Sequence, residues 1–306
     1  MTFTLSVNTN PLVNRFAEPE DVISVLTDEV GIGHIQLVHE FINPSWDTTT
    51  IRRLTDRMAQ TLAAKRARIT SAMTGPYGRL NHFGHPDAGV RAYYVQWFKT
   101  FSDIAADLGC PAIGTQFAIL TYRDMDDRAR YEAIMAAAMQ CWREIAEHAL
   151  KRGLSYLFWE PMSVARELGH TLQATQDLQD WINGAALPLP LKPMVDIDHG
   201  DVTSANRRNA DPYAWAKDFA TQSPIIHIKQ SSMNKGGHWP FTVQYNADGR
   251  ITPDALLAAV REGGGISNEL CLELAFRERE PADRSVIAAL RESVAYWEPY
   301  TSTGFN

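Results

Sequence analysis

A carboxylate and a histidine occur together at the end of an apolar run in the second half of the chain. Segment 191–201 reads L-K-P-M-V-D-I-D-H-G-D, so Asp196 ends the run and His199 follows three residues later. A carboxylate at the tip of a buried strand is unfavourable unless a cation meets it. The pair therefore predicts a polar site at the end of a strand, with both side chains contributing to it.

Three other apolar segments end in residues of the same chemical kind. They are Y-L-F-W-E, I-I-H-I-K and L-C-L-E, which contribute Glu160, His227 and Glu273. Three carboxylates and an imidazole suit Mg²⁺ or Mn²⁺, suit Zn²⁺ less well, and do not suit copper or an Fe–S cluster. Each residue alone could instead form an internal ion pair or a cap. The four together with Asp196 predict one metal site.

Apolar segments typical of strands alternate eight times with segments typical of helices. We expect strands at 3–7, 35–41, 67–73, 111–116, 154–160, 191–196, 225–229 and 270–273, and helices at 18–29, 47–64, 87–108, 126–152, 174–182, 211–221, 253–261 and 281–297. This alternation, without a linker or a change in composition, predicts an α/β chain that forms a single (β/α)₈ TIM-barrel domain over 1–306. A doubly wound open sheet fits less well, because no glycine fingerprint follows the first strand.

The predicted barrel explains why four distant segments would share one site. Active groups of such barrels lie at the carboxyl ends of the strands, where the βα loops form one face. Two loops on that face, 75–86 and 231–251, are longer than the barrel needs, and we expect them to be substrate loops or lids. The sequence N-A-D-G at 246–249 predicts a tight turn in the second.

Composition limits the partners and the compartment. The 306 residues are 45% hydrophobic and carry a net charge of −7, so a nucleic-acid partner is not expected. Cys110, Cys141 and Cys271 are odd in number and scattered, which indicates reduced thiols and a cytoplasmic protein. The N-terminus does not read as a signal peptide, and the longest apolar run, 133–142, is too short to span a membrane.

The order of these strand ends resembles a known superfamily. Glu, Asp-x-x-His, His and Glu in this order are similar to the xylose isomerase-like TIM barrels, and within them to the ketose 3-epimerases. The resemblance implies one Mg²⁺ or Mn²⁺ held by Glu160, Asp196, His227 and Glu273, with the two glutamates acting as acid and base on opposite faces of the substrate. It also implies that His199 contacts a substrate oxygen, and it suggests a homodimer.

The chain departs from the ketose 3-epimerases at two places. They carry an Asn-Arg pair soon after the first glutamate, whereas P-M-S-V-A-R-E follows here, and they carry an arginine where this chain has Met233. These changes affect the expected sugar contacts and leave the metal set intact. The segments W-E-P-M-S-V-A-R-E and H-I-K-Q-S-S look most similar to enzymes of tetritol breakdown that epimerise erythrulose 1-phosphate at C3. A small ketose or ketose phosphate is therefore the expected substrate.

The residues themselves are consistent with this carbohydrate 3-epimerase chemistry. A metal ion that chelates the C2 carbonyl and C3 hydroxyl would stabilise an enediolate, and inversion needs a base on one face and an acid on the other. His199 and Lys229 are candidates to hold the oxygen at C2, although Lys229 could also be a structural ion-pair partner. Donors for a phosphate are available at Arg166, Gln230, Ser231, Ser232, Lys235 and Arg277, and loop 75–86 adds Arg79, His82 and His85.

Three other functions stay open at this point. An aldose–ketose isomerase would use the same metal to move hydrogen between C1 and C2. An abasic-site metal endonuclease would need further ligands and a basic groove. After His227 the sequence offers only His238, with Gly236 where an aspartate would be needed. A barrel without catalytic activity also stays open, since fold does not dictate function.

Overall fold

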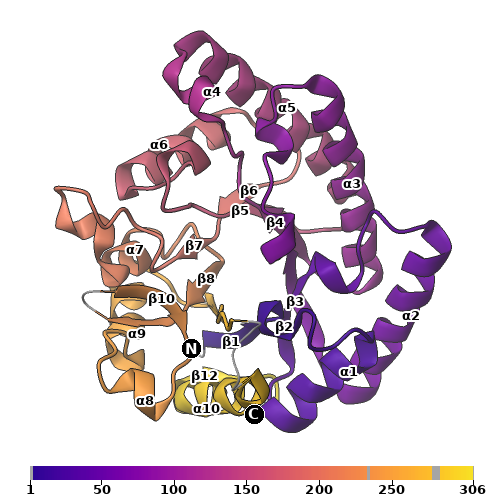
Figure 1. The fold of residues 1–306 in the computed structure, drawn as a ribbon, viewed down its shortest axis with the longest axis vertical. Coiled ribbons are helices and arrows are strands. Elements are labelled where there is room, and N and C mark those ends of the chain that lie inside the picture. The colour runs from indigo at the N-terminus through magenta and orange to yellow at the C-terminus, as the bar shows by residue number, and fades with distance from the viewer. Residues whose placement is uncertain (1–2, 233–234, 278–282, 306) are drawn as a thin grey trace.

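Parallel strands form the centre of the molecule, and helices surround them (Figure 1). The structure is a computed structural model that describes residues 3–232, 235–277 and 283–305, without the side chains of residues 235 and 236. The strands that form the barrel are β1 (Phe3–Asn8), β2 (His34–Val38), β3 (Arg68–Met73), β4 (Ala112–Thr115), β5 (Tyr156–Trp159), β6 (Leu191–Pro193), β7 (Val195–Asp196), β8 (Ile225–Ile228) and β11 (Glu269–Leu272). Neighbouring strands follow the order β6-β5-β4-β3-β2-β1-β11-β8-β7, and each pair is parallel. The predicted barrel is confirmed.

The expected strand 191–196 is interrupted, which corrects the sequence-based prediction. Its first part, β6, pairs with β5, and its second part, β7, pairs with β8. At the break, the Met194 amide donates to the Trp159 carbonyl at 2.8 Å, while the Val195 amide donates to the Ser223 hydroxyl at 3.0 Å. The chain therefore changes partners at Met194, and this change closes the barrel and sets Asp196 opposite His227.

The helices follow the predicted segments closely. They are α1 (Pro19–Ser24), α2 (Thr48–Lys65), α3 (Ala88–Asp107), α4 (Tyr122–Asp126), α5 (Arg128–Lys151), α6 (Leu172–Gly184), α7 (Pro212–Asp218), α9 (Pro253–Glu262) and α10 (Val286–Trp297). The helix expected over 126–152 is α5, which begins after Asp127, because Asp127 is extended and its carboxylate caps α5 by accepting from the amides of Ala129 and Arg130. The short α4 before it was not expected. Residues 281–282 of the last predicted helix lie outside the described residues.

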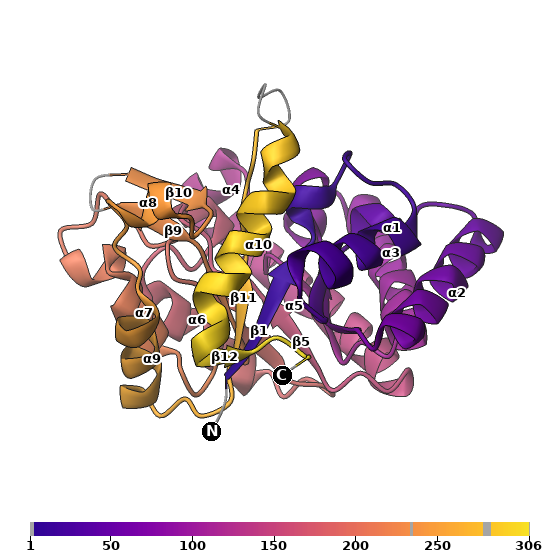
Figure 2. The same cartoon turned by 90° about the horizontal axis from the view of Figure 1, so that it is seen from below.

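The long loop expected over 231–251 contains regular structure. Strands β9 (Gln230–Ser232) and β10 (Lys235–Trp239) form an antiparallel hairpin, and α8 (Val243–Asn246) follows. The turn predicted at N-A-D-G is present, since the Gly249 amide donates to the Asn246 carbonyl at 3.3 Å. Figure 2 shows β9, β10 and α8 at the end of the barrel opposite the start of β1 and the short β12 (Thr301–Ser302). The hairpin therefore lies at the end where the carboxyl ends of the parallel strands meet.

Large aromatic side chains fill the space between the helices and the sheet. Trp142, Trp215 and Trp297 are fully buried, and the cysteines at 110, 141 and 271 are buried free thiols. Among the residues that the structure describes, no helix combines the length and the apolarity that crossing a bilayer requires. The closely packed core supports the strands whose carboxyl ends carry the polar groups.

Candidate active site

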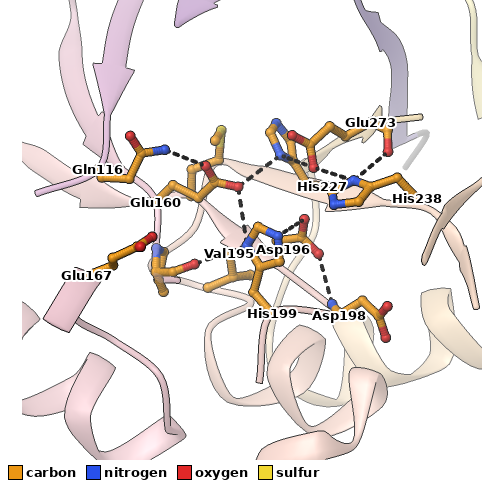
Figure 3. Close-up of polar contacts among 12 residues, drawn as sticks. Gln116, Glu160, Glu167, Val195, Asp196, Asp198, His199, His227, His238 and Glu273 are labelled. Atoms are coloured by element: carbon orange, nitrogen blue, oxygen red, sulfur yellow. Dashed lines mark hydrogen bonds and ion pairs between the residues drawn. The ribbon is translucent and has the colours of Figure 1, made fainter. Parts of the chain in front are cut away.

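The four predicted metal ligands meet at the carboxyl end of the barrel (Figure 3). Glu160 directly follows β5, Asp196 ends β7, His227 lies within β8, and Glu273 directly follows β11. All four side chains are buried. Nδ1 of His227 lies 3.4 Å from Oε1 of Glu160 and 3.3 Å from Oε2 of Glu273. Residues that are up to 113 positions apart in the sequence thus form one cluster.

His199 completes the cluster from the turn after β7. Its Nε2 lies 3.3 Å from Oδ2 of Asp196, and its Nδ1 lies 3.5 Å from Oε1 of Glu160. One ligand atom from each of Glu160, Asp196, His199 and Glu273 lies within 4.8 Å of the others, a spacing that could hold a metal ion. This compact set contains His199 in place of His227, so the structure offers two imidazoles to the same three carboxylates.

Two atoms of the cluster lack hydrogen bonds and fit a bound cation. Among the described residues, Oε1 of Glu160 and Nδ1 of His227 are buried without a hydrogen-bond partner. A buried polar atom without a partner costs about 1–3 kcal/mol, so such atoms are rare in folded proteins. Carboxylate oxygen and imidazole nitrogen are both ligands for divalent metals, and one ion between them would satisfy both atoms. The residues therefore fit the divalent ion that the sequence predicts.

Gln36 of β2 orients the imidazole of His227. Its Oε1 lies 2.7 Å from Nε2 of His227 and accepts from Nδ2 of Asn8 at 2.6 Å, while its Nε2 donates to the Ser71 hydroxyl at 2.9 Å. Because the amide oxygen can only accept, Nε2 of His227 carries the proton in this contact. Nδ1 is then the nitrogen that faces the carboxylates, as a metal-binding histidine requires. Nothing in the sequence pattern pointed to Gln36.

Lys229 reaches the centre of the cluster. Its side chain is 1% exposed, and its Nζ is in ion-pair contact with Asp196. The same nitrogen lies 3.3 Å from Oε2 of Glu273 and 3.3 Å from Nε2 of His199. Burial lowers the pKa of Lys229, but the charges of Asp196 and Glu273 outweigh burial and raise it above its ordinary value. Lys229 is therefore a buried cation of the site, and it is not a solvent-exposed lysine at the end of a strand.

His238 joins the cluster from the β9–β10 hairpin. Its Nδ1 lies 3.3 Å from Oε2 of Glu273 and 3.0 Å from Nζ of Lys229. The sequence suggests His238 only as a ligand of a nuclease site, because the sequence does not predict the hairpin that carries it over the cluster. Gln116, which follows β4, was also missed, and its Nε2 donates to Oε2 of Glu160 at 3.3 Å. Neither residue belongs to a motif that spacing would reveal.

Burial and neighbouring charges shift the pKa values of the cluster in opposite directions. Burial raises the pKa of Asp196 to about 6, although Lys229 opposes this shift, and burial together with the Lys229 charge lowers the pKa of His199 to about 3. Burial would raise the pKa of Glu273, but Lys229 and His227 hold it well below its ordinary value. Burial disfavours a charged His227, yet the charge of Glu273, followed by polar contacts with Cys271 and Glu160, raises its pKa well above its ordinary value. Without a metal ion, the positive charges of Lys229 and His227 thus balance the negative charges of the carboxylates.

The polar residues predicted after β8 have structural partners. The Gln230 amide donates to Oδ1 of Asn246 at 2.9 Å and to the Ile251 carbonyl at 3.0 Å, and its oxygen accepts from the Ile251 amide at 3.0 Å. Gln230 therefore anchors the segment after α8 and is not brought to the cluster. The Ser231 hydroxyl donates to Oδ1 of Asp198 at 3.1 Å and accepts from Nε of Arg250 at 2.9 Å. This contact ties the hairpin to the turn after Asp196.

The predicted arginines lie in the loops around the cluster. Arg166 contacts Oε1 of the buried Glu167 at 2.7 Å, and Arg79 forms an ion pair with the other oxygen of the same carboxylate. Arg277 is exposed after β11. His82 is buried among aromatic rings, and Nδ1 of His85 accepts from the Asp87 amide at 3.1 Å. The position of Met233 and the side chain of Lys235 lie outside the described part of the chain.

Comparisons with known proteins agree with the barrel fold. The model of the family described as xylose isomerase-like TIM barrel matches residues 26–296. D-erythrulose 1-phosphate 3-epimerase of Brucella abortus (strain 2308) is 59% identical over 304 residues, which cover 99% of this chain and 98% of that protein. Two solved structures share the fold at less than 25% identity. A protein of Rhodospirillum rubrum has a TM-score of 0.87 at 24% identity, and the match covers 98% of this chain and 100% of that one. D-psicose 3-epimerase of Clostridium cellulolyticum has a TM-score of 0.68 at 13% identity, and the match covers 96% of this chain and 99% of that one.

Proposed function

Because this chain belongs to the xylose isomerase-like TIM-barrel family, we propose that it is an isomerase that inverts C3 of a small ketose phosphate. The preferred substrate is erythrulose 1-phosphate, whose L and D forms the enzyme interconverts. The proposal is supported by the 59% identity, over nearly the full length of both chains, to a protein named for this reaction. Inversion at C3 removes a proton from one face of the carbon and returns one to the other.

The observation that carries the proposal is the placement of two buried glutamates on different sides of the barrel mouth. Glu160 and Glu273 follow β5 and β11, and each lies within 3.4 Å of the same nitrogen of His227. A substrate bound at the mouth of the barrel between the two glutamates would have one carboxylate on each side. One glutamate then removes the C3 proton as base, and the other donates a proton as acid. The roles exchange when the opposite epimer is the substrate.

One Mg²⁺ or Mn²⁺ bound by Glu160, Asp196, His227 and Glu273 would polarise the C2 carbonyl and lower the free energy of the enediolate. The chain's own residues hold the rest of the substrate. His199 is neutral near pH 7, because its pKa is lowered to about 3, so it can donate one hydrogen bond to the oxygen at C2. Lys229 supplies a positive charge beside the same oxygen.

For the phosphate we propose Arg166, Ser231 and Arg277, which lie in the loops after β5, β8 and β11. Arg166 contacts Glu167 and keeps about a third of its side chain exposed. Gln230 acts indirectly, since its amide anchors the segment that carries Arg250 and so supports Ser231. We further propose that the enzyme is a cytoplasmic homodimer of tetritol catabolism, without a nucleic-acid or membrane partner.

The proposal is tested by giving the enzyme each epimer separately. L-erythrulose 1-phosphate and D-erythrulose 1-phosphate are incubated with Mg²⁺, and the products are separated on a chiral column after dephosphorylation. Both reactions should converge on the same mixture of epimers, and EDTA should stop both. Formation of an aldose phosphate without the second ketose epimer would identify an aldose–ketose isomerase instead. Conversion of neither compound would remove the proposed substrate.

A further inference from the structure

The candidate metal site already contains a positive charge that belongs to the chain. Nζ of Lys229 contacts Asp196 and lies 3.3 Å from both Glu273 and His199. These are three of the four residues whose ligand atoms lie within 4.8 Å of one another. Nζ thus contacts two of the three carboxylates of this small set and its histidine. The ammonium therefore stands where a divalent ion bound to the same carboxylates would stand.

We propose that Lys229 is an internal counter-ion that balances the metal-free site and leaves the carboxylates when a divalent ion binds. The inference rests on the proposed metal dependence, and it adds a residue that competes with the metal. Two cations cannot share the oxygens of Asp196 and Glu273 at contact distance, because like charges in a buried site repel strongly. A buried carboxylate cluster without any cation is equally unfavourable.

The inference requires a second position for the Lys229 side chain. The lysine stem has several rotatable bonds and a compact charge, so a change of rotamer moves Nζ without moving the strand. His238 of the hairpin lies beside Nζ, with both ring nitrogens within 3.2 Å. A shift away from Asp196 keeps the ammonium near His238 and the mouth of the barrel. There it can contact the oxygen at C2 of the substrate. Lys229 would then balance the carboxylates in the metal-free site and contact the substrate in the metal-bound site.

The inference predicts that removing the lysine charge strengthens metal binding. Lys229→Met keeps the length of the apolar stem and removes the competing ammonium, while Lys217→Met is the control, because Lys217 lies on the surface and pairs with Glu262 at 3.0 Å. Mn²⁺ affinity is measured by calorimetric titration of EDTA-treated, dialysed protein, without any ketose. The Kd of Lys229→Met should fall at least tenfold, and that of Lys217→Met should equal the wild-type value.

Thermal unfolding gives a second readout that does not depend on activity. Without metal, Lys229→Met should unfold at a lower temperature than wild type, and saturating Mn²⁺ should raise its Tm by more than it raises the wild-type Tm. If the metal-free Met variant does not fold, Lys229→Gln and crystal structures of the wild type with and without Mn²⁺ replace it. The structures should then show Nζ out of contact with Asp196 only when Mn²⁺ is bound.

Mn²⁺ affinity that is equal or weaker in the folded Lys229 variants would overturn the inference, as would a wild-type lysine that keeps its contact with Asp196 when Mn²⁺ is bound. If neither protein binds Mn²⁺, both this inference and the metal part of the proposed function fail. Tighter Mn²⁺ binding by Lys229→Met, together with a wild-type protein that inverts no ketose, would leave the inference standing and reject only the proposed reaction. The two failures are therefore distinguishable.

Discussion

Oε1 of Gln36 lies 2.7 Å from Nε2 of His227, at the bottom of the site and on the opposite side of the ring from the carboxylates. The amide is itself fixed, because Asn8 donates to its oxygen and its nitrogen donates to Ser71. A chain of hydrogen bonds through the barrel interior thus determines which nitrogen of His227 faces Glu160 and Glu273.

Gln36→Met should therefore weaken metal binding, because the ring of His227 loses the acceptor that fixes its orientation and its proton. Losing such a partner usually costs about 10- to 100-fold in metal affinity or activity. Gln36→Glu keeps an acceptor and should retain more of the affinity than Gln36→Met. Calorimetric titration with Mn²⁺ measures both, with Tm as the check on folding. Equal affinity in wild type and both variants would show that Gln36 does not position His227.

Glu160→Gln and Glu273→Gln should each abolish turnover. Each substitution removes a proton-transfer group, whose loss typically costs 10²- to 10⁴-fold, and each also removes a charged metal ligand. Initial rates with both epimers of erythrulose 1-phosphate measure the loss. Glu132→Gln is a matched control, since this glutamate is exposed on α5 and pairs only with Arg128 at 2.8 Å among the contacts described. Full activity in either active-site variant would rule out the assignment of two proton-transfer groups.

His199→Ala should behave differently from the glutamine variants. We assign His199 to the substrate oxygen, and three carboxylates and His227 stay in place when its ring is removed. The variant should therefore keep its metal, measured by elemental analysis after dialysis, while kcat/KM falls by about 10- to 100-fold, the loss expected when one hydrogen bond to a charged oxygen is removed. Loss of the metal together with activity would instead make His199 a ligand, as the spacing of the compact set allows.

The strands and the polar residues at their ends could be predicted from the sequence, because both depend on short local patterns. Glu160, Asp196, His227 and Glu273 each interrupt or end an apolar run, and a parallel barrel brings such ends together whatever the loops do. The position of Lys229 depends on side-chain direction at the end of β8, which the pattern I-I-H-I-K does not specify. His238 depends on the β9–β10 hairpin, which lies in a polar, glycine-containing segment without a strand pattern. The role of Gln36 could not be predicted, because it depends on His227, which faces it inside the barrel.

His82 should make the stability of the fold depend on pH. Burial, followed by the nearby His39, lowers the pKa of His82 to about 4 from an ordinary value of 6.5, so the folded protein keeps this ring neutral. Below pH 6.5 the unfolded chain binds a proton that the folded chain binds only near pH 4. The contribution to stability is therefore complete above pH 6.5 and is lost as the pH falls toward 4. The loss amounts to about 2 kcal/mol at pH 5.

Urea unfolding of wild type and His82→Phe at pH 8 and pH 5, in EDTA, measures this contribution. Phenylalanine keeps a ring beside Tyr94 and Phe98 and does not titrate. The free energy of unfolding should drop less between the two pH values in His82→Phe than in wild type. The same drop in both proteins would mean that His82 does not carry the acid sensitivity.

We assign to this chain the movement of the proton at C3 of a ketose phosphate with the help of a divalent metal. Proton NMR in D₂O with Mg²⁺ tests it most directly, with L-erythrulose 1-phosphate offered beside free erythrulose and longer ketoses. We predict that deuterium enters C3 of erythrulose 1-phosphate, that C1 does not exchange, and that EDTA stops the exchange. An aldose product or exchange at C1 would contradict the epimerase, and the absence of exchange in every ketose would contradict proton transfer by Glu160 and Glu273.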